Sequence, residues 1–261
     1  MMSSLLFLGT GASNGVPVIG CSCEVCKSKS PFNKRLRSAA LIKTGDKRIL
    51  IDAGPDLRMQ ALSHHIGHLD GVIFTHAHQD HTAGIDDLRV FSFRAEKSLP
   101  CLASVETGNE LKLRYYFMFE EKEHEKNRAR LDLITLKGDR GETEFQGLKL
   151  NYFTYLQLGM KVNGFRFGNL AYVTDVEKVT DELIKEVEGV ETLIVSALRH
   201  THSIMHLTVD EAVDFAHKVG AKKTYLTHLS HDLDHHKTNT ILPDDVRLAY
   251  DSLEIPFIAS D

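Results

Sequence analysis

The sequence predicts an α/β fold in which two β-sheets carry helices on their outer faces. Short apolar runs bounded by Gly, Asp, Asn or Pro recur along the whole chain, as strands do. They form two groups that helical segments separate, and no low-complexity tract or Pro/Gly-rich linker divides the 261 residues. We therefore expect one domain, residues 1–261, which is large enough to bury a stable core without disulfides or metal ions.

The strands are recognised from apolar runs and the turns that follow them. Gly45–Asp46 and Gly168–Asn169 are the expected turns of two hairpins. The expected strands are 4–11, 38–44, 48–54, 71–76, 99–104, 131–136, 148–155, 164–175, 192–197, 223–228 and 255–260.

Helical patterns are fewer and lie late in the chain. Thr208 and Glu211 form a capping box that begins a helix over 207–220, whose apolar residues fall on one face. Similar patterns predict helices over 180–189 and 242–253. The charged stretch 119–130 is expected to be a solvated helix end or loop, and His235 and His236 to lie in a solvated loop.

Composition and charge exclude several classes of function. A net charge of −5 gives no overall basic field that would indicate binding to nucleic acid. No early segment resembles a signal peptide, and no run approaches the roughly 20 apolar residues of a membrane helix. We expect a cytoplasmic protein, in which the clustered Cys21, Cys23 and Cys26 are more suited to metal binding than to disulfides.

The segment THAHQDH, residues 75–81, has the composition of a metal site. It follows an apolar strand, and alternate side chains of a strand face the same way. Imidazole nitrogens and carboxylate oxygens are good ligands for zinc and similar ions. His76 and His78 can chelate one ion, and Asp80 and His81 can serve a second ion nearby.

This segment resembles the signature of the metallo-β-lactamase superfamily, whose fold is a four-layer αββα sandwich. ILIDAGPD (49–56) supplies Asp52, LAYVTDV (170–176) supplies Asp175 where the family has a carboxylate bridging two metals, and TYLTHLSH (224–231) supplies His228 as the last ligand. The resemblance implies two divalent ions, zinc or manganese, and Asp52 is expected to accept an N–H from a ligand histidine. The implied ligands are His76, His78 and Asp175 for the first ion and Asp80, His81, Asp175 and His228 for the second.

One subgroup matches more of the chain. LGTGASNGVPVIGCSCEVCK (8–27), RSAALI (37–42), GFRFG (164–168) and THLSH (227–231) resemble the cyclic phosphodiesterases associated with carbon–phosphorus lyase pathways. The resemblance implies a structural zinc ion held by Cys21, Cys23, Cys26 and His231, a donor set that suits a closed tetrahedral site. Cys101 is expected to be a core residue, and GTGASNG a loop near the site rather than a dinucleotide motif.

The chain departs from the superfamily pattern at one ligand. A third histidine for the first metal is expected seven residues before Gly164, where this chain has Gln157. A glutamine oxygen binds zinc more weakly than imidazole does. Either Gln157 is a substitute ligand that favours manganese or iron, or the first metal binds loosely or is absent.

The resemblance implies a hydrolase that acts on small cyclic or nucleotide phosphodiesters through a metal-activated hydroxide. The catalytic residues are expected to be Asp80 and a proton donor from RHTHSIMHLT (199–208), first His206 and second His202, with Arg199 as a phosphate-binding candidate. The alternatives are an acyl or thioester hydrolase, or a weakly catalytic protein of pyrroloquinoline quinone biosynthesis. We expect a small phosphodiester as substrate, no membrane or large nucleic acid as partner, and a homodimer as in relatives.

Overall fold

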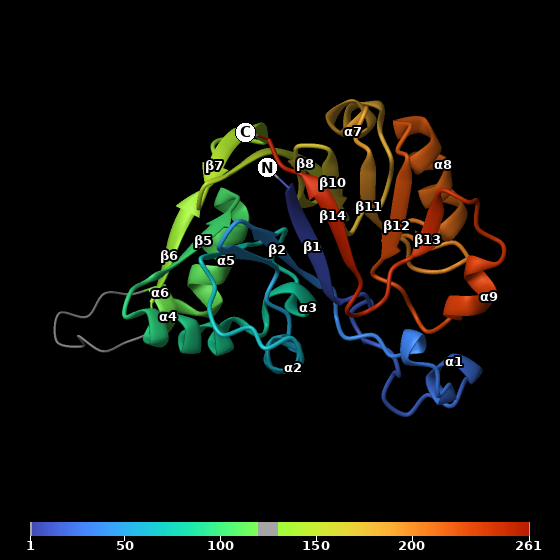
Figure 1. Cartoon of the computed structure of the whole chain (residues 1–261), viewed down its shortest axis with the longest axis horizontal. Helices are drawn as coiled ribbons and strands as arrows, with labels where there is room; N and C mark the ends of the chain where they lie inside the picture. The colour runs from blue at the N-terminus through green and yellow to red at the C-terminus, as the bar shows by residue number, and fades with distance from the viewer. Residues whose placement is uncertain (1, 120–129, 261) are drawn as a thin grey trace.

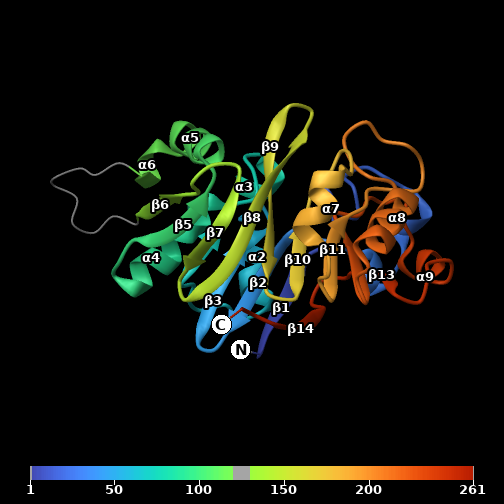
Figure 2. The same ribbon diagram turned by 90° about the horizontal axis from the view of Figure 1, so that it is seen from above.

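In the computed structural model, which describes residues 2–119 and 130–260, two β-sheets lie face to face with helices on their outer sides (Figures 1 and 2). Residues 120–129, most of the charged stretch and including His124, lie outside the described residues. The first sheet has the order β14 (Glu254–Ile258), β1 (Met2–Gly9), β2 (Ala39–Thr44), β3 (Lys47–Ile51), β4 (Gly71–Ile73), β5 (Leu99–Ala103), β6 (Leu131–Thr135). The second has the order β13 (Val246–Leu248), β12 (Lys223–Thr227), β11 (Thr192–Ser196), β10 (Leu170–Val173), β9 (Met160–Phe167), β8 (Leu148–Gln157), β7 (Arg140–Phe145).

The helices divide between the two outer faces. The first sheet is covered by α2 (Leu57–Ser63), η2 (Ile85–Leu88), α4 (Arg89–Ala95), α5 (Val105–Arg114) and α6 (Tyr116–Phe119). The second sheet is covered by α7 (Asp181–Val187) and α8 (Val209–Val219). The short elements α1 (Glu24–Lys27), η1 (Pro31–Asn33), α3 (Gln79–Thr82) and α9 (His235–Asn239) lie in connecting loops.

Alternate side chains along a strand point to opposite faces of the sheet, and this explains how the sheets and helices pack in layers. In β1, Leu5 and Phe7 enter a buried cluster between the two sheets, whereas Leu6 and Leu8 enter a cluster shared with the helices of the first sheet. A third cluster joins the second sheet to α7 and α8. Each fully buried Leu or Phe side chain stabilises such a core by about 1.5–3 kcal/mol. The predicted α/β class and αββα layering are confirmed.

Both sheets contain strands that run parallel. In the first sheet β3, β4, β5 and β6 are parallel, and in the second β10, β11, β12 and β13 are parallel. The carboxyl ends of parallel strands meet at one edge of a sheet, where α/β proteins bind ligands. The loops that follow β3, β4, β10 and β12 are therefore the ones that can build a site.

Several local predictions are confirmed. Gly45–Asp46 joins β2 to β3, and Gly168–Asn169 joins β9 to β10, both in antiparallel register. Thr208 caps α8 through a reciprocal bond with Glu211, and Gly220 ends this helix in the left-handed conformation. Among the helices of the described residues, none has both the length and the apolar character needed to span a bilayer.

The helix predicted over 242–253 is wrong. Residues Val246–Leu248 form β13, which pairs in parallel with β12, and Val246 and Leu248 are buried on either side of Arg247. The apolar residues of this segment are spaced as in a helix, but strand pairing at the sheet edge overrides that local preference.

The sequence patterns identify helices late in the chain, but α2, α4 and α5 precede residue 115. Their apolar signal is weak: in α5 the buried residues are Thr107, Gly108 and Leu111. His235 was expected in solvent but is buried in α9, where its ring stacks on Phe32 at 4.8 Å between centroids.

Candidate metal centre

Three residues with ionisable side chains lie within two residues of the carboxyl ends of parallel strands. Asp52 follows β3, Asp175 lies two residues beyond β10, and His228 follows β12. All three have positive φ angles, 62° for Asp52 and 57° for both Asp175 and His228. This left-handed backbone costs on the order of 1–3 kcal/mol for a residue other than glycine, and such residues cluster at active sites. The sequence carries no signal for these conformations.

Side chains distant in the sequence converge into several groups of donor atoms, and two of these groups contain the ligands predicted for the two ions. His76, His78 and Asp175 have ligand atoms within 4.8 Å of one another, and so have Asp80, His81 and His228. The ligands predicted for the two ions of the catalytic centre, Gln157 apart, therefore lie at one place. The loop after β4 supplies His76 and His78, and α3 supplies Asp80 and His81. The loops that follow β10 and β12 of the second sheet supply Asp175 and His228.

Asp175 stands between the groups. Its Oδ2 lies 3.3 Å from His81 Nε2, and its Oδ1 lies 3.4 Å from His228 Nε2. Burial opposes ionisation of Asp175, but the neighbouring imidazoles of His228 and His81 outweigh it and hold the pKa of this carboxyl well below its usual range. Because Asp175 also belongs to the group of His76 and His78, whereas His81 and His228 belong to the other group, its carboxylate lies where a ligand shared by two ions would lie.

His81 is oriented as metal-binding histidines are. Its Nδ1–H donates to Asp52 Oδ2 at 2.7 Å, and the backbone and hydroxyl of Thr75 also donate to Asp52. His81 Nε2 is buried and has no hydrogen-bond partner among the described residues. Burial disfavours protonation of His81, yet the carboxylates around it, chiefly Asp175 and Asp52, raise its pKa well above the ordinary value. The surrounding carboxylates thus favour a positive charge next to Nε2 of His81, and a bound divalent cation would supply that charge.

A second donor set lies beside the first. The Sγ atoms of Cys21, Cys23 and Cys26 lie 3.3, 3.5 and 3.6 Å from Nδ1 of His231. Zinc with ordinary Zn–S and Zn–N bonds in a tetrahedron requires such S···N separations to be about 3.5 Å. The backbone N–H of Cys26 lowers the pKa of the Cys23 thiol to about 6, so this ligand is a thiolate at neutral pH. The set fits a structural zinc ion, and Cys101 lies apart from it, buried in β5.

The loop before α8 brings one histidine into the centre. His206 is buried, its ring stacks on that of His228 at 4.7 Å between centroids, and its Nδ1 lies 3.7 Å from Asp175 Oδ1. Burial, followed by repulsion from His228, lowers the pKa of His206 to about 4. His202 is exposed, and its carbonyl accepts a bond from Arg199.

His206 opens onto a cavity of about 500 Å³. The 12–18 loop forms one wall, which agrees with the expectation that GTGASNG lies near the site. The 198–206 loop and His231 of the cysteine site form the others. The lining mixes polar side chains such as Asn14 and Arg199 with apolar ones such as Ile204 and Met205. The volume is that of a small-molecule site.

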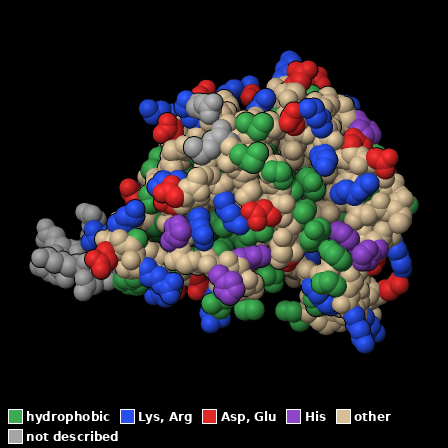
Figure 3. Space-filling view, in the orientation of Figure 1, with side chains coloured by type: hydrophobic (Ala, Val, Ile, Leu, Met, Phe, Trp, Pro, Cys, Tyr) green, Lys and Arg blue, Asp and Glu red, His purple; other side chains and the backbone are tan. Residues whose placement is uncertain are grey.

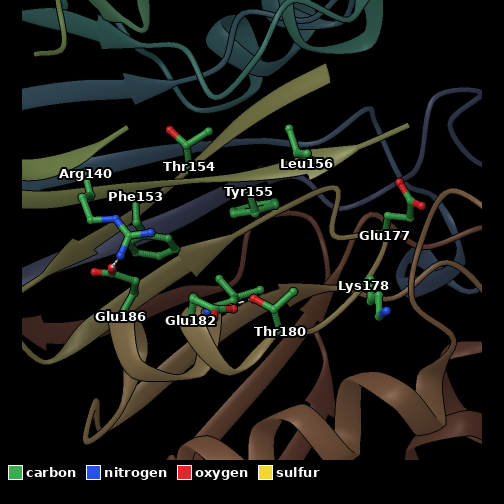
Figure 4. A pocket seen from close by; sticks show the side chains of 11 residues that line it. Arg140, Phe153, Thr154, Tyr155, Leu156, Glu177, Lys178, Thr180, Glu182 and Glu186 are labelled. Carbon is green, nitrogen blue, oxygen red and sulfur yellow. Dashed lines mark hydrogen bonds and ion pairs between the residues drawn. The ribbon is translucent and has the colours of Figure 1, made fainter. Parts of the chain in front are cut away.

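A cavity of about 360 Å³ lies elsewhere, between β8 and α7 (Figure 4). Phe153 and Tyr155 line it, and Arg140 forms an ion pair with Glu186 at 3.2 Å across it. None of the predicted metal ligands lines this cavity. The cavity beside His206 is therefore the candidate substrate site.

Comparison with known proteins identifies the family. Residues 47–229 match the family model described as the β-lactamase superfamily domain. The chain belongs to the metallo-β-lactamase superfamily. A solved structure described as a new diphosphatase from the PhnP family has a TM-score of 0.91 and 35% identity, with 98% of each chain covered. The resemblance to this superfamily and to a hydrolase subgroup within it, predicted from the sequence, is confirmed.

Two further proteins resemble the chain, one in sequence and one in fold. An octanoyltransferase of Porphyromonas gingivalis (strain ATCC BAA-308 / W83) is 33% identical over 252 residues, which cover 95% of this chain and 50% of that protein. The chain thus spans about half the length of this relative. Zn²⁺-bound PqqB from Methylobacterium extorquens has a TM-score of 0.75 at 17% identity, with 97% and 99% of the chains covered, and shares the fold. The fold implies divalent metal ions, and the diphosphatase likeness supports a metal-dependent hydrolase.

Replacing Asp52 by asparagine is expected to weaken divalent-metal binding by about 10–100-fold, because the amide is a poorer acceptor for the His81 N–H that orients this ligand. Isothermal titration of metal-depleted protein measures the affinity. Asp70→Asn is the control, since Asp70 accepts bonds from Lys47 and Arg48 and none from the donor groups. Equal affinities in wild type and Asp52→Asn would show that Asp52 does not support a ligand.

Proposed function

We propose that the chain is a metal-dependent phosphodiesterase acting on small cyclic or nucleotide phosphodiesters. The observation that carries the proposal is the pair of donor groups that Asp175 joins, next to a cavity of about 500 Å³. When bound, two divalent ions would supply a water nucleophile at neutral pH and neutralise the charge that grows on phosphoryl oxygens. The proposed ligands are His76, His78 and Asp175 at one site and Asp80, His81, Asp175 and His228 at the other.

His206 is the proposed proton donor to the leaving oxygen. It lines the cavity and also approaches Asp175, so it lies between the reaction centre and the space for a leaving group. Burial keeps its imidazole neutral, but a phosphate dianion or monoanion in the cavity would favour the protonated form. His202 and Arg199 line the same cavity and are proposed to contact the substrate.

The charge distribution supports a small substrate. The net charge is −5, and the face seen in Figure 3 carries lysine and arginine side chains mixed with acidic ones rather than a broad basic area. Recognition of a large nucleic acid depends on an extended set of basic side chains. The homodimer and the cytoplasmic location stay predictions.

An acyl or thioester hydrolase is the second candidate. The relative named an octanoyltransferase covers nearly the whole chain, and Val18, Leu198, Ile204 and Met205 give the cavity an apolar side that an acyl chain could contact. The same metal centre would activate water for either reaction. A weakly catalytic protein of the PqqB type would turn over neither substrate.

The test compares substrates that differ in reaction and in leaving group. Protein purified without chelators is assayed with bis(p-nitrophenyl) phosphate, a nucleoside 2′,3′-cyclic phosphate and p-nitrophenyl octanoate, each with manganese, zinc or nickel. Metal-dependent cleavage of both phosphodiesters is expected. Cleavage of the octanoate alone would favour the acyl hydrolase, and no turnover of any substrate would contradict both hydrolases.

The proton-donor role of His206 predicts a dependence on the leaving group. His206→Gln is expected to lower kcat for the cyclic nucleotide by about 10²–10⁴-fold, because its alkoxide must be protonated as it departs. The p-nitrophenolate ion leaves without a proton, so its release should change far less. His217→Gln on the exposed face of α8 is the control. Equal losses with both substrates would contradict this role.

A further inference from the structure

Arg35 is a buried arginine in the loop between η1 and β2, with 2% of its surface exposed. Burial lowers the pKa of its guanidinium to about 10, although the carboxylates of Asp251 and Asp234 oppose this shift, so the side chain is charged at neutral pH. A buried charge is unfavourable unless hydrogen bonds satisfy it. The bonds that Arg35 makes therefore show which part of the chain it holds.

The guanidinium of Arg35 binds both ends of one turn. Residues 230–233 form this turn, because the Leu233 N–H donates to the Ser230 carbonyl at 3.4 Å. Arg35 donates through Nη1 to the Ser230 carbonyl at 2.8 Å and through Nη2 to the Leu233 carbonyl at 2.7 Å. His231 is the second residue of the turn, so the two bonds fix the backbone on either side of a predicted zinc ligand.

The backbone of Arg35 binds the segment that leads to the cysteines. Its N–H donates to the Val16 carbonyl and its carbonyl accepts from the Val16 N–H, both at 2.8 Å. Val16 packs with Val25 and Cys26 in the small apolar cluster beside the zinc site. Arg35 thus contacts both halves of a donor set whose cysteines lie 205 to 210 residues from its histidine. None of these contacts involves an ion.

The two halves of this donor set are anchored differently. Leu233, at the end of the turn that Arg35 binds, is fully buried in the main cluster between the second sheet and its helices. The cysteine half packs only in the small cluster of Val16, Val25 and Cys26 and the partly buried side chains around it. The histidine half is therefore held by the core and by Arg35, whereas the cysteine half has little apolar burial to order it.

We infer that Arg35 is a positioning residue for His231, which it holds in place before zinc binds, so that the cysteine segment closes onto a prepared imidazole. Less of the chain then has to be ordered when the ion binds, and the zinc affinity is higher as a result. The inference rests on zinc binding by Cys21, Cys23, Cys26 and His231 and is independent of the proposed phosphodiesterase activity.

Two substitutions and a matched control separate this role from a general contribution to stability. Arg35→Met keeps an apolar stem but has no donors, and Arg35→Lys keeps the charge but replaces the forked guanidinium by one ammonium. The control is Arg166→Met, because Arg166 also donates to two backbone carbonyls, those of Gly168 and Glu188, both at 3.1 Å. Arg166 binds no part of the donor groups.

The first readout is the affinity for zinc, measured by competition with a coloured zinc chelator. Arg35→Met is expected to lower it about 10–100-fold, as the loss of a residue that orients a metal ligand does. Arg35→Lys should lower it less, and Arg166→Met should leave it unchanged. Both methionine variants are expected to have a lower melting temperature, so the zinc affinity alone separates positioning from a loss of stability.

The second readout is hydrogen exchange in protein from which the zinc has been removed. In wild type the Leu233 amide should stay protected, while the amides of Cys21 and Lys27 exchange faster. In Arg35→Met the Leu233 amide should exchange at least about tenfold faster than in wild type, because the turn has lost the bonds that hold it.

Equal zinc affinities in wild type and Arg35→Met would overturn the inference. A Leu233 amide that loses its protection in wild type as soon as zinc is removed would overturn it as well, and so would a wild-type chain that binds no zinc at the cysteines. Failure of the proposed function has a different signature: no phosphodiester would be hydrolysed, while the zinc affinities and exchange rates would still follow the expected pattern.

Discussion

Replacing Asp175 by asparagine is expected to reduce phosphodiester turnover by at least about a thousandfold. The two oxygens of Asp175 lie 3.3 and 3.4 Å from Nε2 of His81 and His228, and Asp175 also has a ligand atom within 4.8 Å of those of His76 and His78. An asparagine keeps the shape but offers one oxygen and one N–H donor, and a donor cannot bind a cation. Both sites would lose a charged ligand together.

Metal content distinguishes this effect from simple unfolding. Wild-type protein is expected to hold about three ions per chain, and Asp175→Asn about one, because the structural zinc set shares no ligand with the centre. The far-ultraviolet circular dichroism should not change. Asp244→Asn is the control, since the Asp244 side chain is fully exposed. Turnover of Asp175→Asn within tenfold of wild type would contradict a bridging role.

Replacing Cys26 by serine is expected to remove one zinc ion and to open the segment around it. The residues near this site form a small cluster of Val16, Val25 and Cys26 that is separate from the three main clusters. With so little apolar burial, the segment depends on the metal for its order. Binding with free zinc at about 1,000 times Kd stabilises a folded segment by about 4.1 kcal/mol, so hydrogen exchange should accelerate about a thousandfold.

The amides to follow are those of Cys21 and Lys27, which donate to the carbonyls of Val18 and Cys23. Since this segment walls the substrate cavity, KM should rise more than kcat falls. Cys101→Ala is the control: it removes a buried thiol from β5 and should leave the zinc content unchanged. Retention of zinc by Cys26→Ser, with unchanged exchange, would show that this thiolate does not hold the ion.

Local rules predicted much of the fold. Hairpin turns at Gly45–Asp46 and Gly168–Asn169 and the capping box of α8 depend on neighbouring residues, so the sequence alone identifies them. The segment 242–253 depends instead on a distant partner, β12, and its own pattern is misleading. Burial of His235 has the same cause, because Phe32 covers it from far along the chain.

The candidate site was partly predictable for a related reason. His76, His78, Asp80 and His81 are close in sequence, so their spacing indicates shared ligation. Asp175 and His228 carry no such signal and entered through the resemblance to a superfamily. The role of Asp52 as hydrogen-bond acceptor for His81 agrees with the expectation. The surroundings of Gln157 could not be predicted, because its amide contacts Met205 and His206, which lie almost fifty residues further along the chain.

The positive φ angles of Asp52, Asp175 and His228 also bear on how this protein reaches its working form in a cell. Together they oppose folding by about 3–9 kcal/mol, a sum comparable to the whole net stability of an ordinary domain. Cations that bind the side chains of these residues offset this cost only after folding has brought the ligands from both halves of the chain together. In newly made protein that lacks metal, we therefore expect the loops that carry these residues to be the least stable part of the fold. We also expect the fraction that survives proteolysis to increase with the supply of metal.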